Sequence, residues 1–348
     1  GLAETQEFLV RGYRHHQHKI RGNHPRNVAL VSQSGAYLIT RMSRLSFLDP
    51  AYAISVGNQI DLSVGDFLHY FNKQEELTTL GFYVEGFNDF DGLSCLQAIR
   101  QARLQRHEVI FYKAGRTPEG KNALSSHTAS IAGDYSVCES CINQAGAMVA
   151  STFSEFEGLL QLSCRLHSRE INGNRLAAVS NAGYEAVGIA DNILGIDFRL
   201  QIAEFSPETA AGLDSLLHSA GLASLVTVSN PLDITPMAGE EVYVEVIRTL
   251  LEDDTIDVVI AAIVPLTPML HTLPTELEPS KTRTTGNNLL EQIGQLWDSS
   301  QKPVVMVVDS GPLYDPLADN LQKRGLPVFR SADIAVRVLG RYLRHRQS

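Results

Sequence analysis

The sequence predicts an α/β protein made of two similar doubly wound domains, each with a parallel sheet between layers of helices. Short, wholly apolar segments alternate with amphipathic stretches of helical period along the chain, and Gly- or Ser-rich loops separate them. Such apolar runs are typical of parallel strands, because helices cover both faces of the sheet. The two halves also repeat, since Val28–Gly35 aligns with Leu176–Gly183 at an offset of 148 residues.

The first half contains the elements of one such domain. Apolar, largely β-branched or aromatic segments predict strands over 28–31, 53–56, 80–84 and 109–112, and a further short strand before residue 155. Apolar residues at helical spacing predict helices over 37–47, 64–71, 93–104, 136–145 and 155–166. The alternation of strand, loop and helix favours a chain that crosses over repeatedly to parallel strands.

The second half repeats this scheme. The same criteria predict strands over 176–179, 226–228, 258–264, 304–308 and 327–329. Helices are expected over 185–193, 207–217, 240–251, 289–296, 314–323 and 334–342. We therefore expect a polar lead segment over 1–26, a first α/β domain over 27–168 and a second over 169–348.

Composition and charge exclude several classes of function. The chain has 348 residues with 44% hydrophobic and 20% charged residues, which is typical of a globular protein. Its net charge of −10 argues against nucleic acid or an anionic membrane as the main partner. We find no apolar run long enough for a membrane helix and no signal peptide, and the four cysteines are too few for a disulfide scaffold. A cytoplasmic location is therefore expected.

Three loops of the first half follow predicted strands and carry groups that suit an anion. Ser32-Gln33-Ser34-Gly35 comes after the first strand and opens a helix, so its amides and hydroxyls would face an anion with the helix dipole assisting. The alternative is an ordinary turn with a capping Ser. Ser55–Asn58, which contains Gly57, follows the second strand and has the same two interpretations. Lys113 and Arg116 end the fourth strand and would add positive charge to the same edge.

Glu85 and His127 are the candidate catalytic pair. His127 lies in the hexapeptide Ser-Ser-His-Thr-Ala-Ser, which we expect to be a loop of small hydroxylated residues that could hold a phosphate. A neutral imidazole nitrogen can attack phosphorus, whereas an exposed loop histidine without function is the alternative. Glu85 ends the third strand and could fix the tautomer of the ring and stabilise a charged phosphoimidazole.

Other motifs predict less chemistry. In the second half, Ser180–Gly183 and Asn230–Asp233 form a similar set of loops, for which turn geometry is the alternative. Cys138 and Cys141 form a C-x-x-C on a predicted helix, where buried or partly buried thiols are favoured over zinc or redox chemistry. His15-His16-Gln17-His18 is taken as a polar lead segment, so no metal site is expected.

Taken in order, these loops resemble one family. The motifs are Val-Ser-Gln-Ser-Gly (31–35), Ser-Val-Gly-Asn (55–58), Tyr-Val-Glu-Gly (83–86), Lys-Ala-Gly-Arg-Thr (113–117), Ser-His-Thr-Ala-Ser (126–130), Ser-Asn-Ala-Gly (180–183) and Asn-Pro-Leu-Asp (230–233). Each is weak alone, but seven in order from about residue 27 to residue 343 are specific. The chain resembles the ligase-domain portion of NDP-forming acyl-CoA synthetases, the superfamily of succinyl-CoA synthetase and ADP-forming acetyl-CoA synthetase. The resemblance implies two flavodoxin-like domains.

The resemblance also implies a phosphate relay. An acyl-CoA reacts with phosphate to give an acyl phosphate and free CoA, and a histidine carries the phosphoryl group to a nucleoside diphosphate. His127 matches that histidine and Glu85 the carboxylate that holds it. The remaining matches are phosphate-binding residues Ser32, Ser34, Gly35, Ser126 and Thr128, with Gly57, Asn58, Lys113, Arg116, Asn181 and Gly183 as supporting residues.

The implied cofactors and partners lie partly outside the chain. The family uses CoA and ATP or ADP with Mg²⁺, held by a CoA-binding Rossmann domain and an ATP-grasp domain or subunit, and it acts on small carboxylic acids. The 26 residues before the first strand contain no G-x-G-x-x-G, and we expect no ATP-grasp domain from residues 27–348, which the two α/β domains occupy. We therefore expect these parts to be supplied elsewhere, with a homo-oligomer also possible. The alternative is a non-catalytic scaffold or regulatory relative that binds an anion or acyl-CoA.

Overall fold

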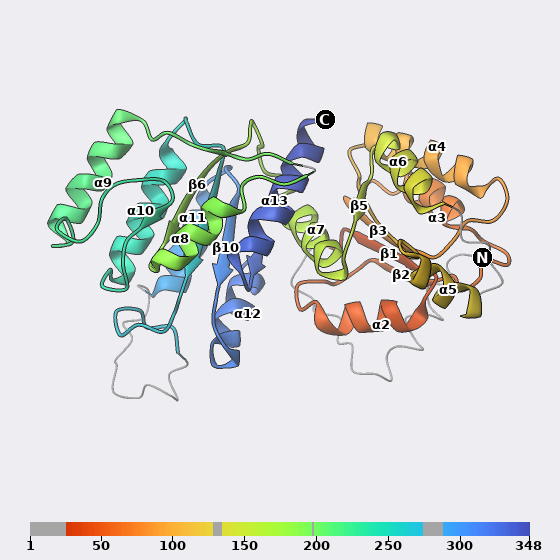
Figure 1. Cartoon of the computed structure of the whole chain (residues 1–348), viewed down its shortest axis with the longest axis horizontal. Helices are drawn as coiled ribbons and strands as arrows, with labels where there is room; N and C mark the ends of the chain where they lie inside the picture. Colours follow the sequence, from red (N-terminus) through yellow and green to blue (C-terminus); the bar gives the residue numbers. More distant parts are fainter. Residues whose placement is uncertain (1–25, 128–133, 197, 274–287) are drawn as a thin grey trace. The chain divides into compact units, whose positions relative to one another are not determined.

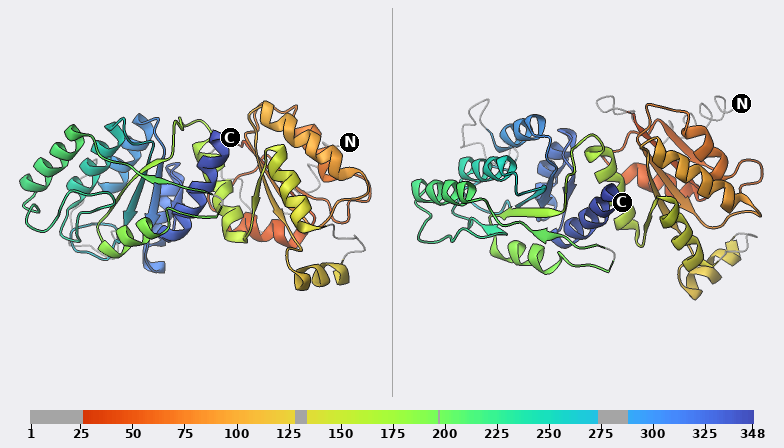
Figure 2. Two further views of the ribbon diagram at one scale, coloured as in Figure 1. Left: turned by 45° about the horizontal axis from the view of Figure 1, so that its top comes forward. Right: turned by 90° about the horizontal axis from the view of Figure 1, so that it is seen from above.

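The computed structural model describes residues 26–127, 134–196, 198–273 and 288–348, with the side chains of residues 125–127 left out of that description. The chain divides into two compact units, with the boundary between His167 and Ser168. In each unit, helices cover both faces of a parallel sheet (Figures 1 and 2). The predicted fold class is thus confirmed, and each unit is described by itself.

The first unit contains five parallel strands in the order β2-β1-β3-β4-β5. Their bounds are β1 Val28–Ser32, β2 Tyr52–Ser55, β3 Thr79–Val84, β4 Glu108–Lys113 and β5 Met148–Ala150. This is the doubly wound order of flavodoxin-like folds, in which the chain reverses its direction of winding between β1 and β3. Ser32 pairs with Ser55 on one side and with Tyr83 on the other, so the ends of these three strands lie at one edge.

Helices cover both faces of this sheet (Figure 1). Their bounds are α2 Gly35–Arg44, α3 Val64–Phe71, α4 Asp91–Leu104, α5 Pro118–His127, α6 Tyr135–Ala145 and α7 Phe153–Leu166. The apolar sides of α3, α4 and α6 form one buried cluster with Phe82 and Phe111 of the sheet. On the other face, α7 comes close to β3 because Gly81 has no side chain; a Cβ there would lie 2.9 Å from Leu160 Cδ2.

The second unit repeats this topology. Its parallel strands are β6 Arg175–Ser180, β7 Gln201–Ile202, β8 Leu232–Asp233, β9 Val258–Ile263, β10 Val304–Val308 and β11 Val328–Phe329. The order is β11-β10-β9-β6-β7, and β8 also pairs with β6. Because β7 pairs with the start of β6 and β8 with its end, the two short strands share one position beside β6. The sheet therefore has the same winding as the first.

The helices of the second unit lie in two layers (Figure 1). Their bounds are α8 Gly183–Asp191, α9 Pro207–Ser219, α10 Glu240–Glu252, α11 Leu289–Ser299, η1 Pro312–Tyr314, α12 Asp315–Lys323 and α13 Ala332–Gln347. Helix α13 packs against α8 and against β10 and β11, while α10 packs against α9, α11 and β9. The wholly buried residues of β9 and β10 fill the space between the layers.

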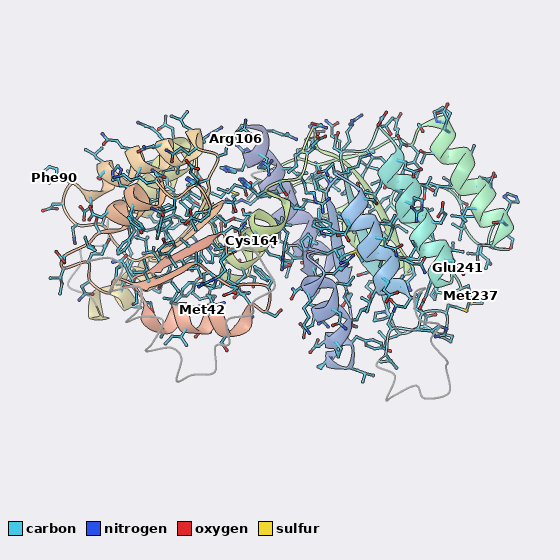
Figure 3. All side chains as sticks on the ribbon, turned by 180° about the vertical axis from the view of Figure 1, so that it is seen from behind. Met42, Phe90, Arg106, Cys164, Met237 and Glu241 are labelled. Atoms are coloured by element: carbon cyan, nitrogen blue, oxygen red, sulfur yellow. The ribbon has the colours of Figure 1, made fainter. Side chains whose placement is uncertain are left out.

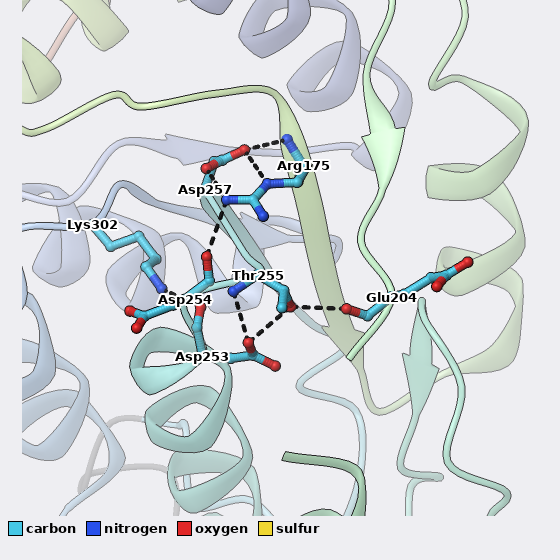
Figure 4. Close-up of polar contacts among 7 residues, drawn as sticks. All are labelled: Arg175, Glu204, Asp253, Asp254, Thr255, Asp257 and Lys302. Carbon is cyan, nitrogen blue, oxygen red and sulfur yellow. Dashed lines mark hydrogen bonds and ion pairs between the residues drawn. The ribbon is translucent and has the colours of Figure 1, made fainter. Parts of the chain in front are cut away.

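A polar network fixes the amino-terminal edge of the second sheet (Figure 4). Asp257 accepts hydrogen bonds from the backbone N–H, Nε and a terminal nitrogen of Arg175, at 2.8–2.9 Å. Asp253 accepts from the Ser206 N–H and from the backbone and hydroxyl of Thr255. These bonds hold the pKa of Asp253 down, at about 2, although burial of the carboxylate opposes the shift.

Three local predictions differ from the structure. Residues 118–127 form helix α5, whereas residues 125–127 were expected in a loop; Pro118 opens the helix, and the absence of an apolar stripe hides it from periodicity analysis. The strand predicted over 226–228 is wrong, since strand pairing occurs at β8 instead. Strand β7 was not predicted, because two residues carry no periodic signal.

Within the described ranges, none of the helices combines the length and apolarity needed to cross a bilayer.

Candidate functional site

The first sheet has its topological switch point between β1 and β3. Ligands of open α/β sheets bind in the crevice beyond the carboxyl ends of the strands at such a point. The loops that follow β1 and β3 carry Ser32–Gly35 and Glu85, the residues predicted to form the site. Both loops therefore lie where this fold binds ligands.

Ser34 is the N-cap of helix α2. Its hydroxyl oxygen accepts a hydrogen bond from the Tyr37 N–H at 3.2 Å, and its own N–H donates to the Ser32 hydroxyl at 3.1 Å. The first turn of α2 contains no acidic residue that would offset the positive end of the helix dipole. The two interpretations of this loop, a capping turn and an anion site, are therefore compatible. The cap uses the neutral Ser34 hydroxyl, and no acidic side chain of the first turn would repel an anion at the N-terminus of α2.

Glu85 and Gly86 are held by three buried side chains. Gln33 Oε1 accepts from the Glu85 N–H at 2.5 Å and from the Gly86 N–H at 3.0 Å. Lys113 Nζ donates to the Glu85 carbonyl at 2.7 Å, and Gln59 Nε2 donates to the Gly86 carbonyl at 3.0 Å. All four backbone polar groups of this dipeptide are therefore bound by side chains from two other loops and from the end of β4.

The side chain of Glu85 lies on the α2 side of the sheet. Burial, and after it the charge of the Glu85 carboxylate and a hydrogen bond with it, raise the pKa of the Tyr83 hydroxyl above its ordinary value. Tyr83 stacks on Tyr37 of α2 with ring centroids 4.2 Å apart. The Glu85 carboxylate is therefore adjacent to Tyr83, on the face that α2 covers.

Lys113 is buried, with 2% of its surface exposed. Its ammonium group donates to the carbonyls of Glu85 and Ala114, both at 2.7 Å, and burial lowers its pKa. Arg116 by contrast is exposed, and its charge lowers the pKa of the Tyr112 and Tyr135 hydroxyls against the larger effect of burial. The two cations thus differ: Lys113 organises backbone, whereas Arg116 faces solvent.

The loop after β2 contributes through a residue that was not singled out. Gly57 and Asn58 are exposed, while Gln59 is buried and contacts Gly86. A Cβ on Gly35 would lie 3.4 Å from Ser55 Oγ, so this loop also borders the start of α2. Nothing in the spacing of the motif marks Gln59, whereas Gln33 could have been found from the repeat, because it aligns with Asn181.

His127 is the last residue of helix α5. Its side chain and that of Ser126 lie outside the described part of the chain, as does Thr128. The structure therefore brings together the Ser32–Gly35 loop, Glu85 and Lys113, and gives only the backbone position of His127. Within the described residues, no cluster of three or more His, Cys, Asp or Glu side chains could hold a metal ion.

The second sheet has a corresponding edge with different charges. Asn181 bridges to the end of β9, donating to the Val264 carbonyl at 2.9 Å and accepting from its N–H at 2.8 Å. A Cβ on Gly183 would lie 2.9 Å from Asp233 Oδ2, so a carboxylate stands at the start of α8. Glu185 in the first turn is 1% exposed, and burial raises its pKa to about 7. The start of α8 is therefore acidic, unlike the start of α2.

Two cysteines of the first unit are partly buried, as the helical pattern predicted. Cys138 and Cys141 lie on α6, and both are free thiols. Burial raises the pKa of Cys138, which disfavours the reactive thiolate.

Comparison with known proteins agrees with the fold and the motifs. Residues 25–163 match the family described as succinyl-CoA ligase like flavodoxin domain. The alpha subunit of ADP-forming acetate–CoA ligase II from Pyrococcus furiosus is 30% identical over 313 residues, which is 89% of this chain and 63% of the relative. Trans-feruloyl-CoA synthase from an unknown prokaryotic organism is 26% identical, over 91% of this chain and 42% of that protein.

Solved structures give the same assignment. Acetyl-coenzyme A synthetase 1 of Ca. Korarchaeum cryptofilum, solved with phosphate and ADP, has a TM-score of 0.74 at 26% identity; the match covers 93% of this chain and 66% of that one. The chain spans 63%, 28% and 34% of the lengths of the first three curated relatives, so it corresponds to part of each. With the seven motifs in order on two flavodoxin-like units, the chain belongs to the family of NDP-forming acyl-CoA synthetases, of which it represents the ligase-domain portion.

Proposed function

We propose that this chain is the phosphoryl-relay part of an NDP-forming acyl-CoA synthetase, with His127 as the phosphoryl carrier and Glu85 as its partner. The observation that supports the proposal most is the fixed Glu85–Gly86 segment beside the phosphate loop, at the switch point of a domain of this family. The names of the relatives, which are ADP-forming CoA ligases, support the reaction class.

The chemistry assigned to these residues is a phosphoryl transfer. A ring nitrogen of His127 forms a bond to the phosphorus of an acyl phosphate while the bond between phosphorus and the acyl oxygen breaks, and the carboxylate leaves with the electron pair. The other ring nitrogen keeps its proton, and the Glu85 carboxylate accepts a hydrogen bond from it and offsets the positive charge. Positioning and charge neutralisation supply most of the catalysis in such transfers.

The N-terminus of α2 suits the phosphate. Free N–H groups of a first helical turn bind phosphate oxygens, and the first turn of α2 carries no acidic side chain to compete. Ser32, Ser34 and Gly35 would form this cradle, with Ser126 and Thr128 contributing hydroxyls and Gly57, Asn58 and Arg116 at its border.

CoA, the nucleotide and Mg²⁺ are assigned to other parts of the assembled enzyme. A CoA-binding domain and an ATP-grasp domain or subunit would hold them, and the acid substrate would be a small carboxylic acid. Asn181 and Gly183 of the second unit remain supporting residues in this proposal. A cytoplasmic location fits nucleotide-dependent chemistry.

The test is reconstitution of the reaction. The chain is combined with CoA-binding and ATP-grasp parts from its own gene neighbourhood, and release of CoA from acetyl-CoA is measured in the presence of phosphate, ADP and Mg²⁺. We expect CoA release that requires both phosphate and ADP and that His127→Ala abolishes. An assembled complex that releases no CoA with any of a panel of short acyl-CoAs would favour the non-catalytic scaffold instead.

A further inference from the structure

We infer that Gln33, Gln59 and Lys113 form a clamp that fixes the backbone of Glu85 and thereby aims its carboxylate at the phosphoryl-transfer site. This inference rests on the proposed function, because it assigns positioning residues to the same site. The three side chains come from the loops after β1 and β2 and from the end of β4. We call them the Glu85 clamp.

In the Glu85 clamp, side chains bind the N–H and C=O groups of Glu85 and Gly86. Peptide groups in surface loops are generally satisfied by water or by neighbouring backbone. Here Gln33 Oε1 accepts from two consecutive N–H groups, while Lys113 and Gln59 each donate to one of the two carbonyls. The three side chains are 8%, 2% and 4% exposed, in the order Gln33, Lys113 and Gln59. Solvent therefore does not compete for these bonds.

Stability alone is a poor explanation for such a cluster. Burial of an ammonium group is costly, and Lys113 takes part in none of the ion pairs of the described residues. An apolar side chain packed at the end of β4 would avoid that cost. The bonds of Lys113 instead go to the carbonyl of Glu85 and to that of its own neighbour Ala114. The arrangement therefore favours positioning over packing.

The clamp is itself anchored. Gln59 has φ of +54°, in the left-handed region that non-glycine residues seldom adopt. Its Oε1 accepts from the Val64 N–H at 3.0 Å, and its carbonyl accepts from Asn88 Nδ2 at 2.9 Å. The Gln33 N–H donates to the Tyr83 carbonyl at 3.1 Å. Gln59 is thus held by α3 and Gln33 by β3, in addition to their bonds with the Glu85–Gly86 dipeptide.

The consequence is a carboxylate with few accessible orientations. The backbone of Glu85 is held on both sides, and its side chain lies beside Tyr83, whose ring stacks on Tyr37 and, with centroids 5.7 Å apart, on Tyr112. A group that must offset charge on a reacting ring acts best when it is held in position beforehand. The clamp supplies that preorganisation through bonds from its side chains to the backbone of Glu85 and Gly86.

The experiment compares clamp variants with a matched control in the full chain. Gln33→Met and Lys113→Met remove the bonding groups and keep side-chain length. Asn72→Ala is the control, because Asn72 is also a buried amide of the first unit, 4% exposed, and donates to the Ala98 carbonyl away from the site. Three quantities are measured: hydrogen exchange of the Glu85 and Gly86 amides, the rate of labelling by ³²P-acetyl phosphate, and the pKa of the His127 ring by NMR.

We expect Gln33→Met to accelerate exchange of both amides and to lower the labelling rate by about 10–100-fold, the usual effect of losing an outer-shell partner. Lys113→Met should lower the labelling rate similarly, while Asn72→Ala lowers the denaturation midpoint and leaves the rate within about twofold of wild type. Gln33→Met should move the pKa of the His127 ring in the direction that Glu85→Gln moves it, which is downward, because an aligned carboxylate favours the charged ring. Lys113→Met also removes a positive charge, which by itself favours the charged ring, so the ring pKa is compared only between Gln33→Met and Glu85→Gln.

Labelling at the wild-type rate in both clamp variants, with the two amides deprotected, would overturn the clamp while leaving the proposed function intact. Absence of label in wild type would instead count against the proposed function, and the ring titration then decides the clamp. In that case, a His127 pKa that responds to Glu85→Gln but not to Gln33→Met overturns the clamp, as does a pKa that responds to neither variant. A pKa that falls in both variants supports the clamp.

Discussion

Gln33 and Asn181 occupy the same position in the two units, and each uses its side-chain amide to hold the loop that leaves the neighbouring central strand. Gln33 Oε1 accepts from the N–H groups of Glu85 and Gly86 after β3, and Asn181 exchanges two hydrogen bonds with Val264 after β9. The preceding serines also correspond, since Ser32 and Ser180 each accept from the N–H two residues ahead. The repeat therefore extends from topology to hydrogen bonds at the switch point.

The two edges nevertheless differ in charge. Ser34 caps α2 with its hydroxyl, whereas Ala182 has no capping group at α8. Asp233 stands at the start of α8, and buried Glu185 lies in its first turn, while α2 has no acid in its first turn. An anion is therefore expected to prefer the edge of the first unit.

This contrast gives the first prediction. Titration of the chain with inorganic phosphate should shift the NMR signals of the Ser34 and Gly35 amides at millimolar concentration and leave those of Ala182 and Gly183 unchanged, because only α2 lacks a carboxylate at its start. The measurement is a series of ¹H–¹⁵N spectra at constant ionic strength with chloride as the control anion. Equal shifts at both edges, or none at Gly35, would count against the phosphate cradle.

The second prediction concerns Glu185. Its pKa is raised from 4.5 to about 7, first by burial and also by the charge of Asp309, against the hydrogen bond from Ser180. The folded state thus favours the protonated form, so this group stabilises the fold fully below about pH 4.5 and loses that contribution as the pH rises through 7.

Glu185→Gln should therefore raise the free energy of unfolding at pH 8.5 by about 1–3 kcal/mol and change it little at pH 4.5. Urea denaturation at the two pH values provides the measurement. A variant that is less stable than wild type at pH 8.5 would show that the ionised carboxylate is well accommodated after all.

The third prediction has the opposite sign. Asp253 has a pKa of about 2 in the folded protein, lowered from 3.8 by hydrogen bonds from Ser206 and Thr255 although burial opposes them. The bonds from Thr255 are drawn in Figure 4. Its contribution to stability is therefore present above about pH 3.8 and is lost as the pH falls through 2.

Asp253→Asn should destabilise the protein by about 1–3 kcal/mol at pH 7, because it removes a charged acceptor. The difference from wild type should shrink as the pH approaches 2. Thermal unfolding followed by circular dichroism between pH 2 and pH 7 checks this, and a destabilisation that is the same at every pH would exclude the ionised carboxylate as its cause.

The sequence predicted the architecture well because parallel strands buried on both faces leave continuous apolar runs. Val258–Ile263 and Val304–Val308 are wholly buried strands, as their composition indicates. Val226–Val228 carries the same signal without strand pairing. Just after it, the Asn230 side chain accepts a hydrogen bond from the Ala178 N–H and donates to the carbonyls of Leu176 and Ala203. This side chain therefore binds backbone groups of β6 that a neighbouring strand would otherwise bind. Composition does not reveal such a replacement.

The candidate site was predictable only in part. The ends of β1 and β3 meet at one edge in a doubly wound sheet, which explains why the loops of Ser34 and Glu85 lie at the same edge, as expected from their positions after strands. The role of Gln59 depends on a left-handed backbone and a contact with Gly86, 27 residues away, which no local pattern records. Nor does a helix without an apolar stripe, such as α5, leave a periodic signal.

Surface residues near this edge also escape sequence analysis. Phe90 has φ of +70°, is 88% exposed and projects from the first unit (Figure 3). Exposure of an aromatic residue depends on what the neighbouring loops cover, and this cannot be derived from the order of residues alone.

The proposed function depends above all on His127 as the carrier of the phosphoryl group. The most direct measurement is labelling of the assembled enzyme with γ-³²P-ATP and Mg²⁺, followed by acid and base treatment, because phosphohistidine is acid-labile and base-stable whereas phosphoserine is not. We predict acid-labile label that His127→Ala abolishes and that Glu85→Gln reduces, since loss of a hydrogen bond to a charged ring weakens the phosphoenzyme by about 1.5–3 kcal/mol. Wild type without acid-labile phosphate, or His127→Ala labelled as strongly as wild type, would contradict the claim.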